Sequence, residues 1–221
     1  MKRMVSMVGA VMVLAAPAAA QWLGMPTWNS AKGGTGVTFY GDYGAPNDSA
    51  LSGHAFGGRA ALGVGTITLT AGVASWKPGG QNARATSYGA TAAFRLIGGS
   101  LIPVSVNLQL GAGHNAIGTS GADTVPASTT VLGAVGFSVP LPTPGISIEP
   151  YFSPGIRYHK FSDVPAGAKD HDTNFGWVIG GNFSFGLVGI HVAYDSEKFD
   201  NGTHGVLGVG ADVGLRLPMG L

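Results

Sequence analysis

The charged residues of this chain share one side of its predicted β-strands. In residues 146–159, Ile148 and Ile156 lie on one side, and Glu149 and Arg157 lie on the other. Because side chains of a strand point alternately to its two sides, this segment has one apolar face and one polar face. The same division recurs in about ten segments, and no charge falls on an apolar face. A soluble sheet rarely shows this pattern, whereas a closed barrel surrounded by lipid requires it.

The segments with this alternation are predicted to be ten strands. Short connections rich in Gly and Pro alternate with longer polar ones, as in outer-membrane barrels with short periplasmic turns and long external loops. We therefore predict an all-β fold, a closed antiparallel up-and-down transmembrane β-barrel of ten strands. Eight strands is the alternative if the first or ninth does not form, and an even number places both chain ends on the periplasmic side. The expected strands are residues 35–44, 55–64, 66–76, 85–96, 101–113, 130–139, 146–159, 173–185, 188–196 and 204–217.

Eight charged residues of these strands are predicted to face the barrel interior. A Lys or Arg facing lipid at mid-membrane costs about 2–4 kcal/mol, and a buried charge is costly unless it is paired. We expect salt bridges and hydrogen bonds across the lumen, which leave room for a narrow water path at most. The predicted lumen charge network is Asp42, Arg59, Arg95, Glu149, Arg157, Asp195, Asp212 and Arg216.

Aromatic residues on the apolar faces cluster near both ends of the strands. Amphipathic rings favour the headgroup zone, so two aromatic girdles are expected. Near the long loops we place Tyr43, Phe56, Tyr88, Tyr158, Phe175, Trp177 and Tyr194; near the short turns we place Phe94, Phe137, Phe183 and Phe185.

Two prolines interrupt the seventh predicted strand. Pro150 and Pro154 lack the backbone N–H that a closed sheet needs, so we expect a bulge or a locally broken ladder there.

The first twenty residues have the pattern of a secretory signal peptide. A basic start and an apolar run are followed by the small-residue site Ala18-Ala19-Ala20. We expect residues 1–20 to be removed and residues 21–221 to form one outer-membrane barrel domain; an uncleaved anchor is the alternative. Charged residues are 10% of the chain, against about 25% in soluble domains. There is no cysteine, so disulfides and thiolate metal sites are excluded, and the near-neutral charge does not favour nucleic acid.

Two segments carry a family resemblance. Residues 148–158, Ile-Glu-Pro-Tyr-Phe-Ser-Pro-Gly-Ile-Arg-Tyr, resemble a strand of small bacterial outer-membrane barrels, in which a Pro-Tyr pair precedes a Gly and alternating aromatics. Residues 205–217 are similar to the last strand of these proteins. The chain thus resembles the superfamily of the outer membrane protein A transmembrane domain and the opacity proteins. The resemblance implies the fold, the bacterial outer membrane as location, and outer-membrane lipid and the barrel insertion machinery as partners. Unlike that family, the chain ends in an aliphatic residue, Leu221.

No catalytic set is evident in the predicted strands. His191 and Asp195 are four residues apart on one strand, about 13 Å along its axis, so they cannot form a dyad. No histidine is followed at the second position by serine, as a lipid A deacylase resemblance would need. A protease-like set would need Asp42 or Asp195 near His54 or His204 at the rim. We therefore predict no catalytic residues, no metal and no cofactor.

The sequence predicts a non-enzymatic role, either in envelope structure or in surface contacts through the outer loops. The first alternative is a narrow channel for ions or small solutes, and the second is a barrel enzyme acting on lipid or peptide at the outer rim. A secreted soluble β-sandwich is the rival fold, and it would keep its outer faces polar. The acidic loop Asp170-His171-Asp172 is interpreted as solvated rather than as a cation site.

Overall fold

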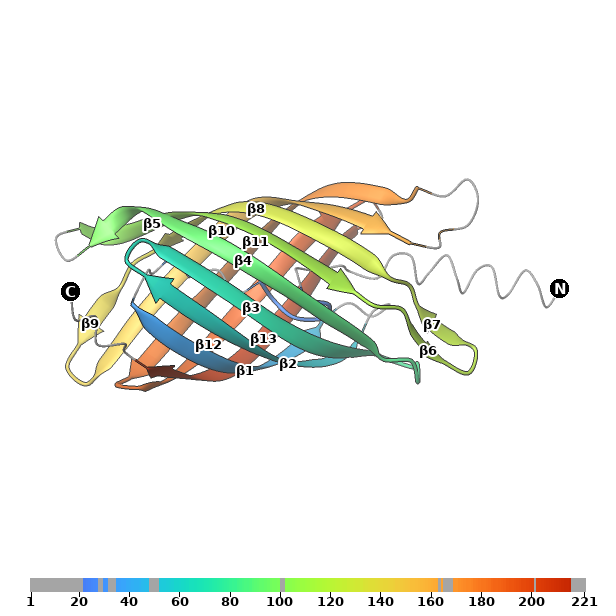
Figure 1. Cartoon of the computed structure of the whole chain (residues 1–221), viewed down its shortest axis with the longest axis horizontal. Coiled ribbons are helices and arrows are strands. Elements are labelled where there is room, and N and C mark those ends of the chain that lie inside the picture. Colours follow the sequence, from blue (N-terminus) through green and yellow to red (C-terminus); the bar gives the residue numbers. More distant parts are fainter. Residues whose placement is uncertain are drawn as a thin grey trace.

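A closed β-barrel makes up most of the computed structural model (Figure 1). The structure describes residues 22–27, 30–31, 35–47, 52–99, 102–162, 164, 169–200 and 202–215. The ten long strands are β1 (Gly36–Pro46), β2 (Gly53–Val64), β3 (Ile67–Pro78), β4 (Ala85–Gly99), β5 (Ile102–Asn115), β8 (Ser128–Ser138), β10 (Ile146–Phe161), β11 (His171–Phe185), β12 (Val188–Phe199) and β13 (Gly202–Leu215). The short strands are β6 (Gly118–Ser120), β7 (Asp123–Val125) and β9 (Leu141–Thr143).

Each long strand pairs with the next along the chain, and the first pairs with the last. The β1–β13 ladder runs from Val37 opposite Leu215 to Pro46 opposite Val206. Closure leaves the sheet without the free edges that an open sheet must protect. The predicted ten-stranded antiparallel barrel is confirmed, and the β-sandwich rival is wrong. Within the described residues, no helix is long and apolar enough to cross a membrane.

The two ends of the barrel differ in their connections. At the loop end lie the connections that follow β1, β3, β5, β10 and β12, including the β6–β7 hairpin. At the turn end lie those that follow β2, β4, β8 and β11, together with β9, which pairs with the start of β10. In Figure 1 the hairpin marks the loop end on the right, and β9 marks the turn end on the left.

Burial alternates along the strands, with apolar side chains on the outside. In β8, Val131, Val135 and Phe137 are exposed, while Thr130 and Ser138 are buried. This is the reverse of a soluble domain, and it is the pattern expected when the surrounding medium is apolar. The barrel interior is therefore the polar part of this molecule.

Two irregularities differ in kind. Across Pro150 and Pro154 the register between β10 and β11 is unbroken, and pairing with β8 only skips Ser153 and Pro154. Of the two irregularities expected at these prolines, the structure therefore has the locally broken ladder. A bulge lies instead in β4, where the register with β5 shifts on both sides of Ile97. Leu96 and Ile97 are consequently both exposed.

Two boundaries correct the predictions from sequence. β12 continues to Phe199, so Glu197 lies in a strand and not in the loop expected at residues 197–203. The segment before β1 was given no place in the barrel, and both chain ends were expected at the turn end. Trp22 and Leu23 instead lie at the loop end, beside Trp76 and Ala85. The lumen encloses this apolar segment, and Trp22 and Leu23 are buried there.

Candidate functional site

The segment before β1 occupies the lumen. We call residues 22–27, 30 and 31 the lumen segment. Trp22, Leu23 and Met25 are buried in one apolar cluster at the loop end. The barrel side of this cluster comes from Ala55, Ala74, Trp76, Ala83, Ala85 and Val125. Small alanines on three strands and the connection before β4 leave the room that the two indole rings fill.

Backbone contact is close where the segment passes β1. A Cβ atom on Gly44 would clash with the carbonyl oxygen of Gly24, and a Cβ on Gly24 would clash with the indole of Trp76. Gly24 also has a φ of 73°, which favours glycine. Glycine is therefore required at both positions for the segment to fit.

Hydrogen bonds fix the segment along its length. The Leu23 N–H donates to Ser87 Oγ at 3.1 Å, and the Thr27 N–H donates to Asp195 Oδ2 at 2.9 Å. Nearer the turn end, Ser30 Oγ donates to Glu149 Oε1 at 2.9 Å. The segment thus descends through the lumen from the loop end, and two buried carboxylates hold it.

A charged cluster lies beside the segment in the loop half. Arg157 Nη1 is 2.8 Å from Asp195 Oδ1 and 3.0 Å from Glu197 Oε2. All three side chains are buried, with exposures of 5%, 0% and 0%. One guanidinium therefore neutralises two carboxylates, and one of these also accepts the hydrogen bond from the lumen segment.

Glu197 extends this cluster to a histidine. Its Oε1 is 2.6 Å from His159 Nε2, and Thr130 Oγ1 is 2.9 Å from His159 Nδ1. A hydroxyl, an imidazole and a carboxylate in this order resemble an activated nucleophile. Here, however, all three are buried, and the rings of Phe161 and Phe199 stack on His159. Thr130 has no exposed side for a substrate, so the chain of contacts is structural.

A second cluster lies in the turn half. Arg59 Nε is 2.7 Å from Asp42 Oδ2, and His191 Nε2 is 2.7 Å from Asp42 Oδ1. His191 Nδ1 is 3.4 Å from Asp212 Oδ1. The Arg59 guanidinium lies 4.0 Å from the centre of the Tyr40 ring, in cation–π contact. Asp42 therefore contacts a histidine from a strand 149 residues later in the chain.

A polar cavity of about 260 Å³ adjoins this second cluster. It extends to the turn end, where residues of the β11–β12 turn line it. Glu149 lies on its wall, and the carboxylate accepts hydrogen bonds from Ser30 Oγ and from Asn182 Nδ2 at 3.2 Å. Both donors are neutral, so Glu149 differs from the other buried acids of the lumen.

The predicted charge network is divided between these places. Asp42, Arg59 and Asp212 meet in the turn half, Arg157 and Asp195 meet in the loop half, and Glu149 contacts neutral groups. Arg95 donates to the carbonyl of Gly65 at 3.3 Å rather than to an acid. Arg216 lies outside the described residues. Of the rim histidines proposed for a protease-like set, His54 packs on Phe56 and His204 packs on Phe199.

Sequence reasoning missed Glu197 and the pairing of His191 with Asp42. Glu197 continues the inward alternation of His191 and Asp195 along β12, and this period was the signal available. Within the described residues, no three His, Asp or Glu side chains are arranged to hold a metal ion.

Aromatic side chains lie on the outer face near both ends. Most of those placed in the two girdles are exposed; Trp177, Tyr194 and Phe183 are half-buried. Trp177 and Tyr194 pack together with ring centres 5.8 Å apart. The exposed members are Tyr43, Phe56, Tyr88, Tyr158, Phe175, Phe94, Phe137 and Phe185.

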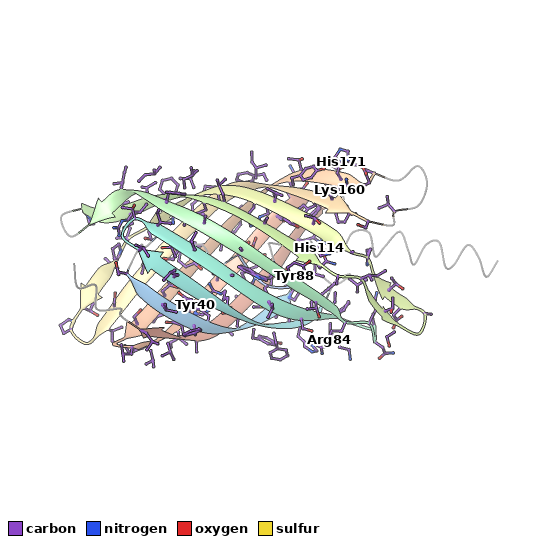
Figure 2. All side chains as sticks on the ribbon, in the orientation of Figure 1. Tyr40, Arg84, Tyr88, His114, Lys160 and His171 are labelled. Carbon is purple, nitrogen blue, oxygen red and sulfur yellow. The ribbon has the colours of Figure 1, made fainter. Side chains whose placement is uncertain are left out.

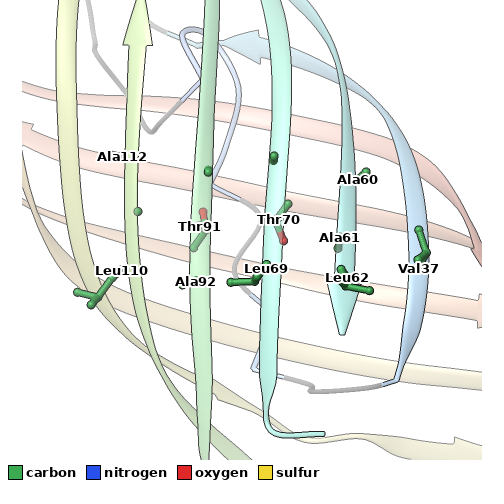
Figure 3. A pocket seen from close by; sticks show the side chains of 13 residues that line it. Val37, Ala60, Ala61, Leu62, Leu69, Thr70, Thr91, Ala92, Leu110 and Ala112 are labelled. Atoms are coloured by element: carbon green, nitrogen blue, oxygen red, sulfur yellow. The ribbon is translucent and has the colours of Figure 1, made fainter. Parts of the chain in front are cut away.

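The outer face also has a shallow apolar depression of about 660 Å³ (Figure 3). Four alanines in one register row form its floor: Ala60, Ala71, Ala90 and Ala112. Larger side chains such as Leu69 surround them, and no charged residue lines the depression. This surface is separate from the polar lumen.

The comparisons with known proteins identify a fold and no closer relationship. No protein-family model matches the chain, and no curated protein matches its sequence. Among solved structures, the beta domain of the Bordetella autotransporter BrkA has a TM-score of 0.53 at 9% identity, over 81% of this chain and 98% of that one. The outer membrane enzyme PagL has a TM-score of 0.41 at 13% identity, over 80% and 99%. A bacterial polysaccharide outer membrane secretin has 0.46 at 14% identity over 76% of this chain, which spans 57% of that protein.

The fold is therefore that of the bacterial outer-membrane β-barrels. The resemblance inferred from residues 148–158 and 205–217 is confirmed at the level of the fold. At these identities the comparisons do not transfer any activity.

Proposed function

We propose that this protein is an outer-membrane β-barrel with a sealed lumen, and that its role is non-enzymatic. The observation that carries the proposal is the lumen segment, whose apolar cluster fills the loop half beside the Arg157 cluster. A barrel filled in this way serves envelope structure or presents its loop end to partners. The exposed apolar outer face supports location in the outer membrane, with lipid and the insertion machinery as partners. In this orientation the loop end faces outward, and residues 1–20 act as the signal peptide.

Location is tested by cell fractionation combined with gel mobility before and after heating. A folded barrel is expected in the outer-membrane fraction, with faster migration before heating than after it. Recovery in the soluble fraction would contradict the proposal.

Sealing is tested by conductance in planar bilayers. The wild-type protein is expected to give no steady unitary steps. Gly44→Val places a branched side chain against the Gly24 carbonyl and should displace the lumen segment, so that steps appear. Gly41→Val is the matched control on β1, because a Cβ at Gly41 meets open space. This control should behave as the wild type.

A narrow channel is the second candidate, favoured by the polar cavity at the turn end. Steady unitary steps from pure wild-type protein would support the channel and overturn the sealed barrel. If Gly44→Val keeps its heat-dependent mobility but stays silent, a part of the lumen other than the segment forms the seal.

A further inference from the structure

One register row on the outer face places four polar side chains side by side. His114 on β5 lies opposite Thr129 on β8, Thr129 opposite Lys160 on β10, and Lys160 opposite His171 on β11. We call these four residues the rim row. Tyr88 on β4 extends it by one strand. Residues more than 50 positions apart in the sequence therefore form one continuous line across four strands.

The rim row lies at the boundary of the apolar band. Two residues further along the same strands toward the turn end, Val131 and Tyr158 are exposed on the same face. Figure 2 shows Lys160, His171, His114 and Tyr88 on the half of the barrel toward the loop end. A side chain at this height in a membrane meets lipid headgroups, where a lysine can extend its ammonium group from the apolar surface.

Contacts within the row hold its histidines in place. His114 Nδ1 is 3.0 Å from Thr129 Oγ1, and the His114 ring packs on Tyr88 with centres 5.5 Å apart. The His171 ring packs on Tyr158 at 6.0 Å. Both histidines therefore lie against aromatic rings at the boundary, and the Nδ1 atom of each contacts a neighbouring polar group.

Lys160 supplies a cation to this surface. Within the described residues, Lys160 forms no ion pair. Among the residues that the structure describes, the acid that contacts the row is Asp170, whose Oδ1 is 2.7 Å from His171 Nδ1. The hydrogen bond from His171 lowers the pKa of the Asp170 carboxyl, so this acid is ionised at neutral pH. Because Asp170 is held by His171, the ammonium group of Lys160 is available to an anion.

We propose that the rim row binds phosphate groups of lipid headgroups in the leaflet at the loop end. Lys160 supplies the charge, and Thr129, His114 and His171 supply hydrogen-bonding groups along one line. Strands lie about 4.8 Å apart, so the row is about 14 Å long and can contact more than one phosphate. The inference rests on the proposed membrane location, and it names the residues that select the lipid.

The experiment uses the full chain reconstituted into vesicles of phosphatidylcholine with one-tenth phosphatidic acid. The protein is then extracted in mild detergent, and the phosphatidic acid that stays bound is measured. The wild type is expected to retain phosphatidic acid at about fivefold or more above its share in the vesicle. This is the enrichment that the attraction of one surface cation for anionic lipid, about 1 kcal/mol, would produce. The double variant Lys160→Ala, His171→Ala should lose this enrichment. A parallel arm with excess inorganic phosphate distinguishes lipid from free phosphate, because lipid binding should persist.

Lys169→Ala is the matched control, because it removes one exposed charge at the same end outside the row. This variant should keep the enrichment. Equal enrichment in the wild type and the double variant would overturn the proposal, as would an equal loss in Lys169→Ala. Displacement by inorganic phosphate would show a free-ion site and likewise overturn it. Failure of the wild type to enter vesicles would overturn the membrane location itself, whereas insertion without enrichment would overturn the rim row alone.

Discussion

The loop half and the turn half of the lumen contain the same kind of chemistry in different surroundings. Each half has one buried arginine paired with acid, Arg157 with Asp195 and Glu197, and Arg59 with Asp42. In the loop half, the lumen segment and its apolar cluster exclude water. In the turn half, a cavity of about 260 Å³ adjoins the cluster. An ion pair of the same kind therefore contributes more to the free energy of unfolding where water cannot replace a lost partner.

The largest effect is expected for Arg157→Ala. This change removes the guanidinium from two fully buried carboxylates. Glu197 keeps its contact with His159, whereas Asp195, which anchors Thr27 of the lumen segment, loses its ion pair. Breaking a buried ion pair in this way costs about 3–5 kcal/mol. The free energy of unfolding is measured by urea titration of the protein in lipid vesicles. Arg157→Lys keeps the charge and should lower the free energy of unfolding by less. A decrease below about 1 kcal/mol in Arg157→Ala would show that the loop half contains water.

A smaller loss is expected for Arg59→Ala. Asp42 keeps its contact with His191, and water from the cavity can solvate the carboxylate once the Arg59 side chain no longer covers it. We expect a loss of about 1–3 kcal/mol, the usual range for leaving one polar group without its partner. The measurement is the same urea titration, and Arg157→Ala is the reference. Equal losses in the two variants would mean that both halves are equally dry, and the contrast between them would fail.

Period-two alternation was sufficient to predict the ten strands and their closure, because a chain with one apolar face per strand has few other ways to hide it. The partners inside the barrel were not predictable in the same way. Asp42 meets His191 because of the stagger with which the strands close, and this stagger depends on all ten strands together.

The lumen segment was missed for a different reason. Residues 22–31 have neither the period of a strand nor that of a helix, because their apolar residues are spaced irregularly among small and polar ones. Such a segment is recognisable only once the cavity that it fills is known. Gly44 illustrates this, because the need for a glycine there becomes evident only when Gly24 is seen to lie against it.

The smallest effect is expected for Glu149→Gln, although Glu149 is as buried as the acids of the loop half. Its donors, Ser30 and Asn182, are neutral, and a glutamine of the same shape can keep hydrogen bonds to both after the Asn182 amide and Ser30 hydroxyl reorient. The substitution also removes a desolvated charge, so the free energy of unfolding should change by about 1 kcal/mol or less. Glu149→Ala, which deletes the anchor, should instead loosen the lumen segment and raise proteolysis near Ser30. A loss in Glu149→Gln as large as that in Arg157→Ala would mean that the charge itself is needed. The turn-end cavity would then have to hold a cation, and the two halves would be alike in pairing every buried acid.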